Sequence, residues 1–172
     1  TRAAQESELV EMALPRLDGL LRSGVTRIEV KSGYGLTLDS EVKMLNVAKA
    51  LSKNSPINVT TTYLGAHALP PEYEDNADGY IDYVCGQCIP YIAKHDLAQS
   101  VDVFCESIGF TPTQCEKVFH TANQHGMQIH AHVEQLSNLE GAKLASKMGA
   151  LSVDHIEFLE SKDVVTLADN DT

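Results

Sequence analysis

Residues 100–133 read SVDVFCESIGFTPTQCEKVFHTANQHGMQIHAHV, and this stretch predicts one complete strand–helix–strand unit. The run Ser100–Glu106 is short and rich in apolar residues, as a buried strand is. Residues 113–124 have the spacing of a helix, and Gly126 follows as a stop signal. The run Gln128–Val133 predicts the second strand. Links this short favour a right-handed crossover between two parallel strands.

The same alternation extends in both directions along the chain. The other predicted strands are Arg27–Lys31, Asn58–Leu64 and Leu151–Ile156. The other predicted helices cover residues 5–22, 39–53 with Thr37 as the cap, 76–95 with a kink or break at Pro90, 137–148, and a segment that begins at Ser161. This order predicts an α/β fold with a parallel sheet. An open sheet fits, and so does an incomplete (β/α)8 barrel, since a full barrel needs eight units and about 250 residues.

The composition is that of an ordinary soluble globular protein. The 172 residues are 43% hydrophobic, enough for one domain with a sizeable core. The net charge of −11 argues against a nucleic-acid partner and against an anionic membrane surface, because both need a basic footprint. No run approaches the roughly 18 apolar residues that a membrane span needs.

Cys85-Gly-Gln-Cys88 is a C-x-x-C pair, a pattern found in redox centres and in halves of zinc sites. A structural zinc site needs a second close pair, and Cys105 and Cys115 are too far apart along the chain to supply one. A redox pair belongs at a helix start just after a strand, whereas this pair lies inside a predicted helix. We therefore interpret all four cysteines as small buried residues with reduced thiols, which favours a cytoplasmic protein.

Polar and titratable residues follow every predicted strand, where ligands bind in either fold. They are Tyr34, His67, Glu106, His132 with Glu134 and Gln135, and His155. His130 and His132 share one strand face, so both could hold one metal, although a catalytic site commonly needs three protein ligands. A lone strand-end histidine is more often structural. Glu106 could form an ion pair or support a ligand from behind. Residue types alone indicate an α/β hydrolase or lyase, with or without a metal.

Four stretches of the chain resemble imidazolonepropionases of the amidohydrolase superfamily. They are EVKSGYGL at 29–36, TTYLGAHALP at 61–70, VDVFCE at 101–106, and HVEQL at 132–136 followed by GALSVDHIE at 149–157. Each stretch alone is weak, but their order and separations also fit. The resemblance implies a partial (β/α)8 barrel, in which residues 1–172 supply about strands two to six. The first strand, the last two strands and a small β-sandwich domain would lie outside these residues.

The resemblance also implies a reaction and its residues. The reaction is hydrolytic ring opening of 4-imidazolone-5-propanoate to N-formimidoyl-L-glutamate in histidine degradation, with one zinc or iron ion activating water. His132 matches the metal ligand, and Tyr34 and His67 match residues that hold the substrate. Gln135 matches a position that contacts the substrate ring near the metal, and His155 matches a histidine that helps activate water. In this register His130 is an extra histidine and not a ligand.

Other parts that the resemblance implies are missing from the sequence. The family's His-x-His pair, its last-strand aspartate and its propionate-binding arginine have no counterpart, and the chain begins at Thr1. We therefore expect a segment of a longer enzyme that is inactive and poorly stable when made alone. The expected partner is the small-molecule substrate, without nucleic acid or membrane, and a homodimer of the full-length enzyme is compatible with the resemblance.

Two other functions stay open at this point. One is a different cyclic amidohydrolase or a deaminase of the same superfamily, which would share the barrel and the metal histidines. The other is a metal-free binding module on a five-stranded open sheet, for which the strand-end residues would be coincidence.

Overall fold

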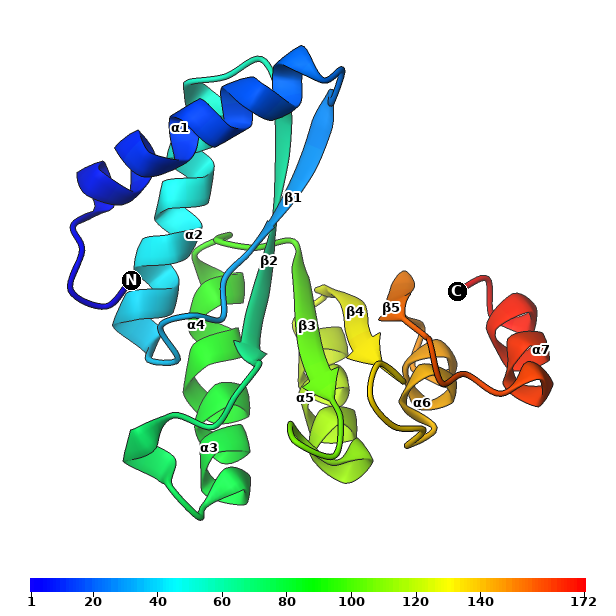
Figure 1. Ribbon diagram of the computed structural model, residues 1–172. Coiled ribbons are helices and arrows are strands. Elements are labelled where there is room, and N and C mark those ends of the chain that lie inside the picture. The colour runs from blue at the N-terminus through cyan, green and yellow to red at the C-terminus, as the bar shows by residue number, and fades with distance from the viewer.

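The computed structural model describes residues 1–172 and contains one sheet of five strands (Figure 1). The strands are β1 (Arg27–Lys31), β2 (Asn58–Ala66), β3 (Ser100–Cys105), β4 (Gln128–Val133) and β5 (Ser152–His155). They lie in chain order, and every neighbouring pair is parallel. A doubly wound sheet would reverse its strand order at a switch point, and this sheet does not. It curls into a half-barrel, which confirms the prediction of a partial (β/α)8 barrel.

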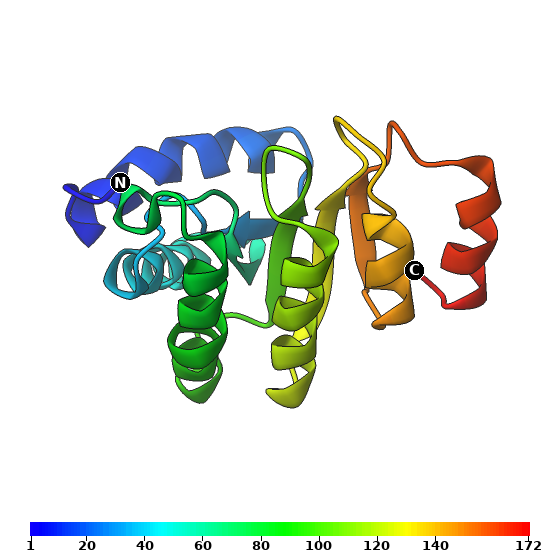
Figure 2. The ribbon, with the colours of Figure 1, turned by 90° about the horizontal axis from the view of Figure 1, so that it is seen from below.

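Helices connect the strands along the outside of the sheet. They are α1 (Glu6–Arg22), α2 (Leu38–Lys53), α3 (Ala77–Tyr83), α4 (Ile89–Lys94), α5 (Pro112–Gln124), α6 (Gly141–Lys147) and α7 (Ser161–Asp169), with a 3-10 turn at Pro71–Tyr73 and a π-helical turn at Val84–Cys88. Figure 2 shows α4, α5 and α6 side by side along one face of the sheet. The two termini lie at opposite ends of the molecule (Figures 1 and 2).

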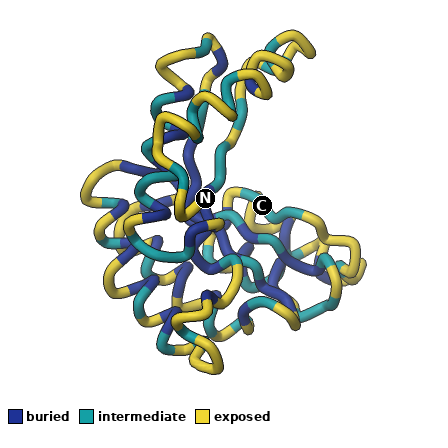
Figure 3. Tube along the Cα trace, turned by 60° about the vertical axis from the view of Figure 1, so that its left-hand side comes forward, coloured by how far each residue is buried: buried dark blue, intermediate teal, exposed yellow.

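The main hydrophobic core lies between the sheet and these helices. Alternate residues of β3 and β4 enter it and are at most 1% exposed: Val101, Val103, Cys105, Ile129, Ala131 and Val133. A smaller cluster joins α1 to α2 and the start of β2, and contains Leu17, Val47, Leu51 and Ile57. Figure 3 shows buried residues concentrated along the strands and exposed residues along the outer surfaces of the helices.

The opposite face of the sheet, called the inner face below, is polar. Side chains alternate along a strand, so the residues between the core residues point away from the helices. The inner face carries Lys31, Asp102, Phe104, His130, His132, Ser152 and Asp154. Barrel interiors are ordinarily filled by bulky branched apolar residues. This concentration of charge therefore marks the inner face as a candidate site.

Most predicted elements agree with the structure within one or two residues. The strands predicted at residues 27–31 and 128–133 have those bounds. Thr37 caps α2, as predicted, because its hydroxyl accepts a hydrogen bond from the N–H of Ser40. The strand predicted at 58–64 continues to Ala66.

The helix predicted over residues 76–95 is divided, as Pro90 suggested, and the break comes before the proline. The π-helical turn at Val84–Cys88 separates α3 from α4. Pro90 has no N–H, and its ring would clash with the carbonyl four residues earlier, so a wider turn relieves the helix there. The C-x-x-C pair lies within this turn. All four cysteines are buried and free, as predicted.

The helix predicted over residues 137–148 is wrong at its start, because α6 begins only at Gly141. The buried carboxylate of Glu134 accepts hydrogen bonds from the N–H groups of Gly141 and Ala142 and so fixes the helix start there. Residues 135–140 form a loop instead. No helix in the structure combines the length and the apolar character needed to cross a membrane.

Candidate functional site

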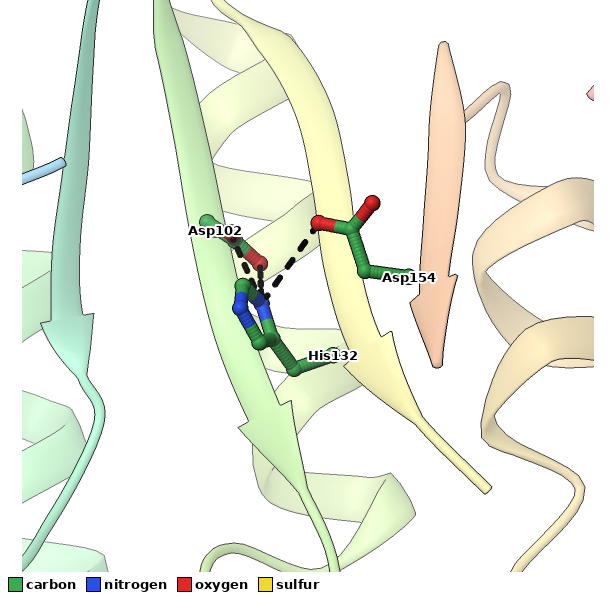
Figure 4. Close-up of side chains that lie close together, drawn as sticks. All are labelled: Asp102, His132 and Asp154. Carbon is green, nitrogen blue, oxygen red and sulfur yellow. Dashed lines mark hydrogen bonds and ion pairs between the residues drawn. The ribbon is translucent and has the colours of Figure 1, made fainter. Parts of the chain in front are cut away.

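A hydrogen-bonded pair on the inner face joins His132 of β4 to Asp102 of β3 (Figure 4). The Nδ1 atom of His132 lies 3.1 Å from Oδ1 and 3.0 Å from Oδ2 of Asp102. An ionised carboxylate only accepts hydrogen bonds, so Nδ1 is the donor and carries the hydrogen. The Nε2 atom of the neutral ring then keeps its lone pair, which is the form that binds a metal.

Lys31 of β1 connects this pair to a second carboxylate. Its Nζ atom donates to Oδ2 of Asp102 at 2.6 Å and to Oδ2 of Asp154 at 2.9 Å. Asp102, His132 and Asp154 together offer three possible metal-ligand atoms within 4.8 Å of one another. The ammonium group of Lys31 pairs with both carboxylates, and Nδ1 of His132 is bonded to Asp102, so Nε2 is the nitrogen of His132 that these contacts leave available to a metal.

The charges of this network stabilise one another. Burial opposes ionisation of Asp102, but the hydrogen bond from His132 and the charge and hydrogen bond of Lys31 outweigh it and hold the pKa of Asp102 below its ordinary value. Burial also opposes the charged form of Lys31, and the attraction of Asp102, followed by that of Asp154 and Glu29, raises the pKa of Lys31 above its ordinary value. Both groups are therefore charged at neutral pH.

His155, at the end of β5, lies beside His132. The centroids of the two imidazole rings are 5.2 Å apart. The Nδ1 atom of His155 lies 3.6 Å from Oε1 of Glu157, an ion-pair distance that is too long for a hydrogen bond. His155 also has a φ of 77°, which is uncommon for a residue with a side chain and recurs at functional sites.

His130 points to the same side of β4 as His132, but it has other partners. Its Nδ1 atom lies 2.8 Å from the hydroxyl of Ser152, and its Nε2 atom lies 3.9 Å from Oε1 of Glu29. His130 is not part of the group of possible metal ligands. Its assignment as a non-ligand stays a prediction with this geometry in its favour.

Tyr34 and His67, which follow β1 and β2, form an edge-to-face pair. Their ring centroids are 5.2 Å apart at an interplanar angle of 79°. Nδ1 of His67 lies 2.8 Å from the carbonyl oxygen of Gly33, so it is the protonated nitrogen and Nε2 is an acceptor in the neutral ring. Gly33 has a φ of 101°, and a Cβ there would lie 2.4 Å from the carbonyl oxygen of Leu64. The close approach of the two strand ends therefore requires glycine.

Gln135 lies in the loop after β4, and Glu106 of the neighbouring strand end holds this loop. The N–H of Gln135 donates to Oε1 of Glu106 at 2.6 Å. The N–H of Leu136 and the hydroxyl of Ser137 donate to the same carboxylate. The expected ion pair of Glu106 is not formed, because its partners are loop donors, and its role in supporting a ligand from behind stays a prediction.

Sequence reasoning missed three residues of the inner-face network: Lys31, Asp102 and Asp154. Each stands within or at the end of a strand. Asp102 between Val101 and Val103 was the clearest signal, because a carboxylate at an alternate position of a buried strand needs a partner. An open surface pocket of about 590 Å³ lies elsewhere, where α1 and α2 begin, and none of the predicted site residues lines it.

Comparison with known proteins places the whole chain in one group of relatives, although no family model matches it. The imidazolonepropionase of Vibrio cholerae serotype O1 is 59% identical to this chain over all 172 residues. The imidazolonepropionases of Ectopseudomonas mendocina and Caulobacter vibrioides are 56% and 55% identical over the same residues. Over its whole length the chain is similar to imidazolonepropionases. It spans only 42–43% of the length of these three relatives.

Two solved structures share the fold of this chain at low sequence identity. An adenine deaminase from Arthrobacter aurescens superposes with a TM-score of 0.67 and 16% identity, over 96% of this chain and 50% of that chain. A mutant organophosphorus hydrolase from Deinococcus radiodurans superposes with a TM-score of 0.65 and 11% identity, over 99% and 56%. In each case the chain covers about half of a larger fold, as a half-barrel would.

Proposed function

We propose that this chain forms the central part of a hydrolase that opens the ring of 4-imidazolone-5-propanoate to give N-formimidoyl-L-glutamate. The observation that carries the proposal is the match over the full 172 residues to imidazolonepropionases at 55–59% identity. The inner-face histidines and the strand-end residues support it, because they gather polar chemistry where barrel enzymes bind substrates. In this proposal the cytoplasm, where histidine is degraded and thiols stay reduced, is the setting.

His132 would hold the metal ion through Nε2, and the structure of its surroundings fits that role. Its Nδ1 hydrogen is directed at Asp102, which fixes the ring orientation and leaves the lone pair on Nε2. A divalent ion such as zinc or iron, when bound, lowers the pKa of its water and so supplies a nucleophile at neutral pH. The remaining ligands would come from sequence outside these 172 residues, together with the first strand, the last two strands and the β-sandwich domain.

Tyr34, His67 and Gln135 are proposed to hold the substrate. The Nε2 atom of neutral His67 is an acceptor, because its Nδ1 hydrogen is directed at Gly33, so it suits a ring N–H of the substrate. The hydroxyl of Tyr34 belongs to a side chain that is 66% exposed and free to meet a ligand. Gln135, a neutral amide, can both donate to and accept from the ring but cannot act as a base.

His155 is proposed to move the proton. Its ring lies next to that of His132, so it can take a proton from the attacking water and later return it to the leaving nitrogen of the opened ring. In its protonated form it would also stabilise the oxyanion that develops on the oxygen of the attacked carbonyl group. The position of His155 beside His132, the proposed metal ligand, suits both the proton transfer and the stabilisation of the oxyanion.

The test uses the product of the complete reading frame that contains these 172 residues. The purified protein, with its metal measured by elemental analysis, is assayed with imidazolonepropionate, a hydantoin and guanine. We expect hydrolysis of imidazolonepropionate alone, loss of activity with a chelator, and recovery with zinc or iron. Turnover of hydantoin or guanine instead would assign another amidohydrolase or deaminase activity. A protein without metal and without turnover would overturn the hydrolase proposal and favour the binding module.

A further inference from the structure

Three buried glutamates at the carboxyl ends of the strands have no cationic partner. Glu41 and Glu106 are 1% exposed and Glu134 is fully buried. A buried carboxylate without a cation must be held by hydrogen-bond donors. Glu134 fixes the start of α6, as described above. The other two hold the loops that carry the proposed substrate residues.

Glu41, in the first turn of α2, holds the loop after β1. Its Oε2 accepts from the N–H of Gly33 at 2.6 Å, and its Oε1 accepts from the N–H groups of Gly35 at 2.9 Å and Leu36 at 2.8 Å. These donors flank Tyr34 on both sides. The carbonyl of Gly33 in turn accepts from His67, so one carboxylate fixes the backbone beside both aromatic residues.

Glu106 holds the loop after β4 in a similar way, with one difference in chemistry. Its Oε1 accepts from the N–H groups of Gln135 at 2.6 Å and Leu136 at 3.0 Å. Its Oε2 accepts from the hydroxyl of Ser137 at 2.5 Å. A hydroxyl can also accept, whereas a backbone N–H can only donate. Ser137 is therefore the one partner of the two carboxylates that could adapt to an amide.

We propose that Glu41 and Glu106 are positioning residues, which fix the loops of Tyr34 and Gln135 in the conformation that binds substrate. The inference rests on the proposed function, in which Tyr34 and Gln135 contact the substrate. Convergent hydrogen bonds to a buried carboxylate remove loop conformations before substrate arrives, so binding does not have to order the loop. Each glutamate acts on its own loop, and so the two are independent of each other.

The first experiment uses double mutants of the full reading-frame product and measures kcat and KM for imidazolonepropionate. We expect E106A to lower kcat/KM by about 10- to 100-fold, since a displacement of about 1 Å can cost that much. In a Q135A background the added effect of E106A should largely vanish, because the residue that it positions is gone. In a Y34F background it should persist in full. Equal effects of E106A in all three backgrounds would overturn the proposal.

The second experiment replaces charge without removing volume. In E106Q the amide NH2 can donate to the hydroxyl of Ser137, so we expect E106Q to keep most of the kcat/KM. The E106Q/S137A double variant removes that acceptor and should lose activity, while S137A alone should not. In E41Q an amide NH2 would face a backbone N–H, so E41Q should lose activity like an alanine variant. Wild-type behaviour of E41Q or of E106Q/S137A would contradict the assignment.

Hydrogen exchange separates this inference from the proposed function. Peptides covering residues 31–37 and 132–138 report the two loops without any substrate. We expect E41Q to speed exchange only in the first peptide and E106Q/S137A only in the second. If the wild-type protein does not hydrolyse imidazolonepropionate, the proposed function fails, whereas the exchange pattern still decides whether these carboxylates order the loops. Unchanged exchange in both peptides would overturn the positioning role itself.

Discussion

The Nδ1 atom of His132 lies within 3.1 Å of both carboxylate oxygens of Asp102, and this contact selects one tautomer of the imidazole. Asp102 is completely buried, and Lys31 holds it in place. The resulting lysine–aspartate–histidine series fixes which nitrogen of His132 is bonded to Asp102 and leaves Nε2 out of these hydrogen bonds. In its proposed role as metal ligand, a ring that is oriented from behind in this way needs little reorganisation when the metal binds.

The first prediction concerns this orientation. D102N should lower the metal affinity of the complete protein by about 10- to 100-fold, because an amide can donate to Nδ1 and stabilise the wrong tautomer. Competition with a chromophoric chelator measures the affinity, and nitrogen chemical shifts of the metal-free protein report the tautomer. Unchanged shifts together with unchanged affinity would show that Asp102 does not orient the ring.

The second prediction concerns Lys31. K31M should destabilise the protein by on the order of 3 kcal/mol, because it leaves the buried carboxylate of Asp102 without its cation. Urea denaturation measures the change. K117M is the matched control: Lys117 pairs with Asp82 on the surface, where both side chains are more than half exposed, so its loss should cost less than about 1 kcal/mol. Equal effects of the two variants would contradict the buried network.

The third prediction concerns pH. Burial opposes ionisation of Glu106, but hydrogen bonds from Ser137 and the loop N–H groups outweigh it and hold its pKa below the ordinary value of 4.5. A folded-state pKa below the unfolded one adds stability that is present above pH 4.5 and is lost as the pH falls through the folded-state pKa. Urea midpoints from pH 7 to pH 3 should therefore fall more steeply for wild type than for E106Q. Parallel curves would remove this role.

The fourth prediction concerns the thiols. Burial raises the pKa of Cys85 and of Cys88, and neither forms a disulfide. Thiolate is the reactive form, so all four cysteines should react with a disulfide reagent at pH 8 only slowly in the folded protein and at once in urea. Rapid labelling of Cys85 and Cys88 in the folded protein would revive the redox interpretation of the C-x-x-C pair.

The fifth prediction concerns residues 1–172 made alone. The outer edges of β1 and β5 have no partner strand, and apolar side chains such as Met12, Phe158 and Val165 are more than half exposed. Unpaired edges and apolar patches favour aggregation. We expect this polypeptide to elute as aggregates and to lack a cooperative melting transition. A monomeric chain that melts cooperatively would instead favour the open-sheet binding module.

The sequence determined the local structure because local structure depends on neighbours along the chain. Period-two alternation placed β4 at Gln128–Val133 and put His130 and His132 on one face. The Thr37 cap and the stop at Gly126 set helix ends. Pro90 divided its helix because proline lacks an N–H and its ring clashes with the preceding turn. The predicted strand ends located the candidate site residues, and the resemblance then implied a role for each, which periodicity alone could not do.

The tertiary structure decided what each polar residue contacts. Lys31, Asp102 and Asp154 stand more than 50 residues apart in sequence, and only the strand order brings them to His132. The start of α6 was mispredicted because Glu134 fixes it through space, at a place where helical periodicity predicted an earlier start. Glu106 seemed a candidate ion-pair partner until its backbone donors were known. Contacts between side chains of different strands depend on the register of the strands and on the curvature of the sheet. The spacing of residues along one strand predicts neither.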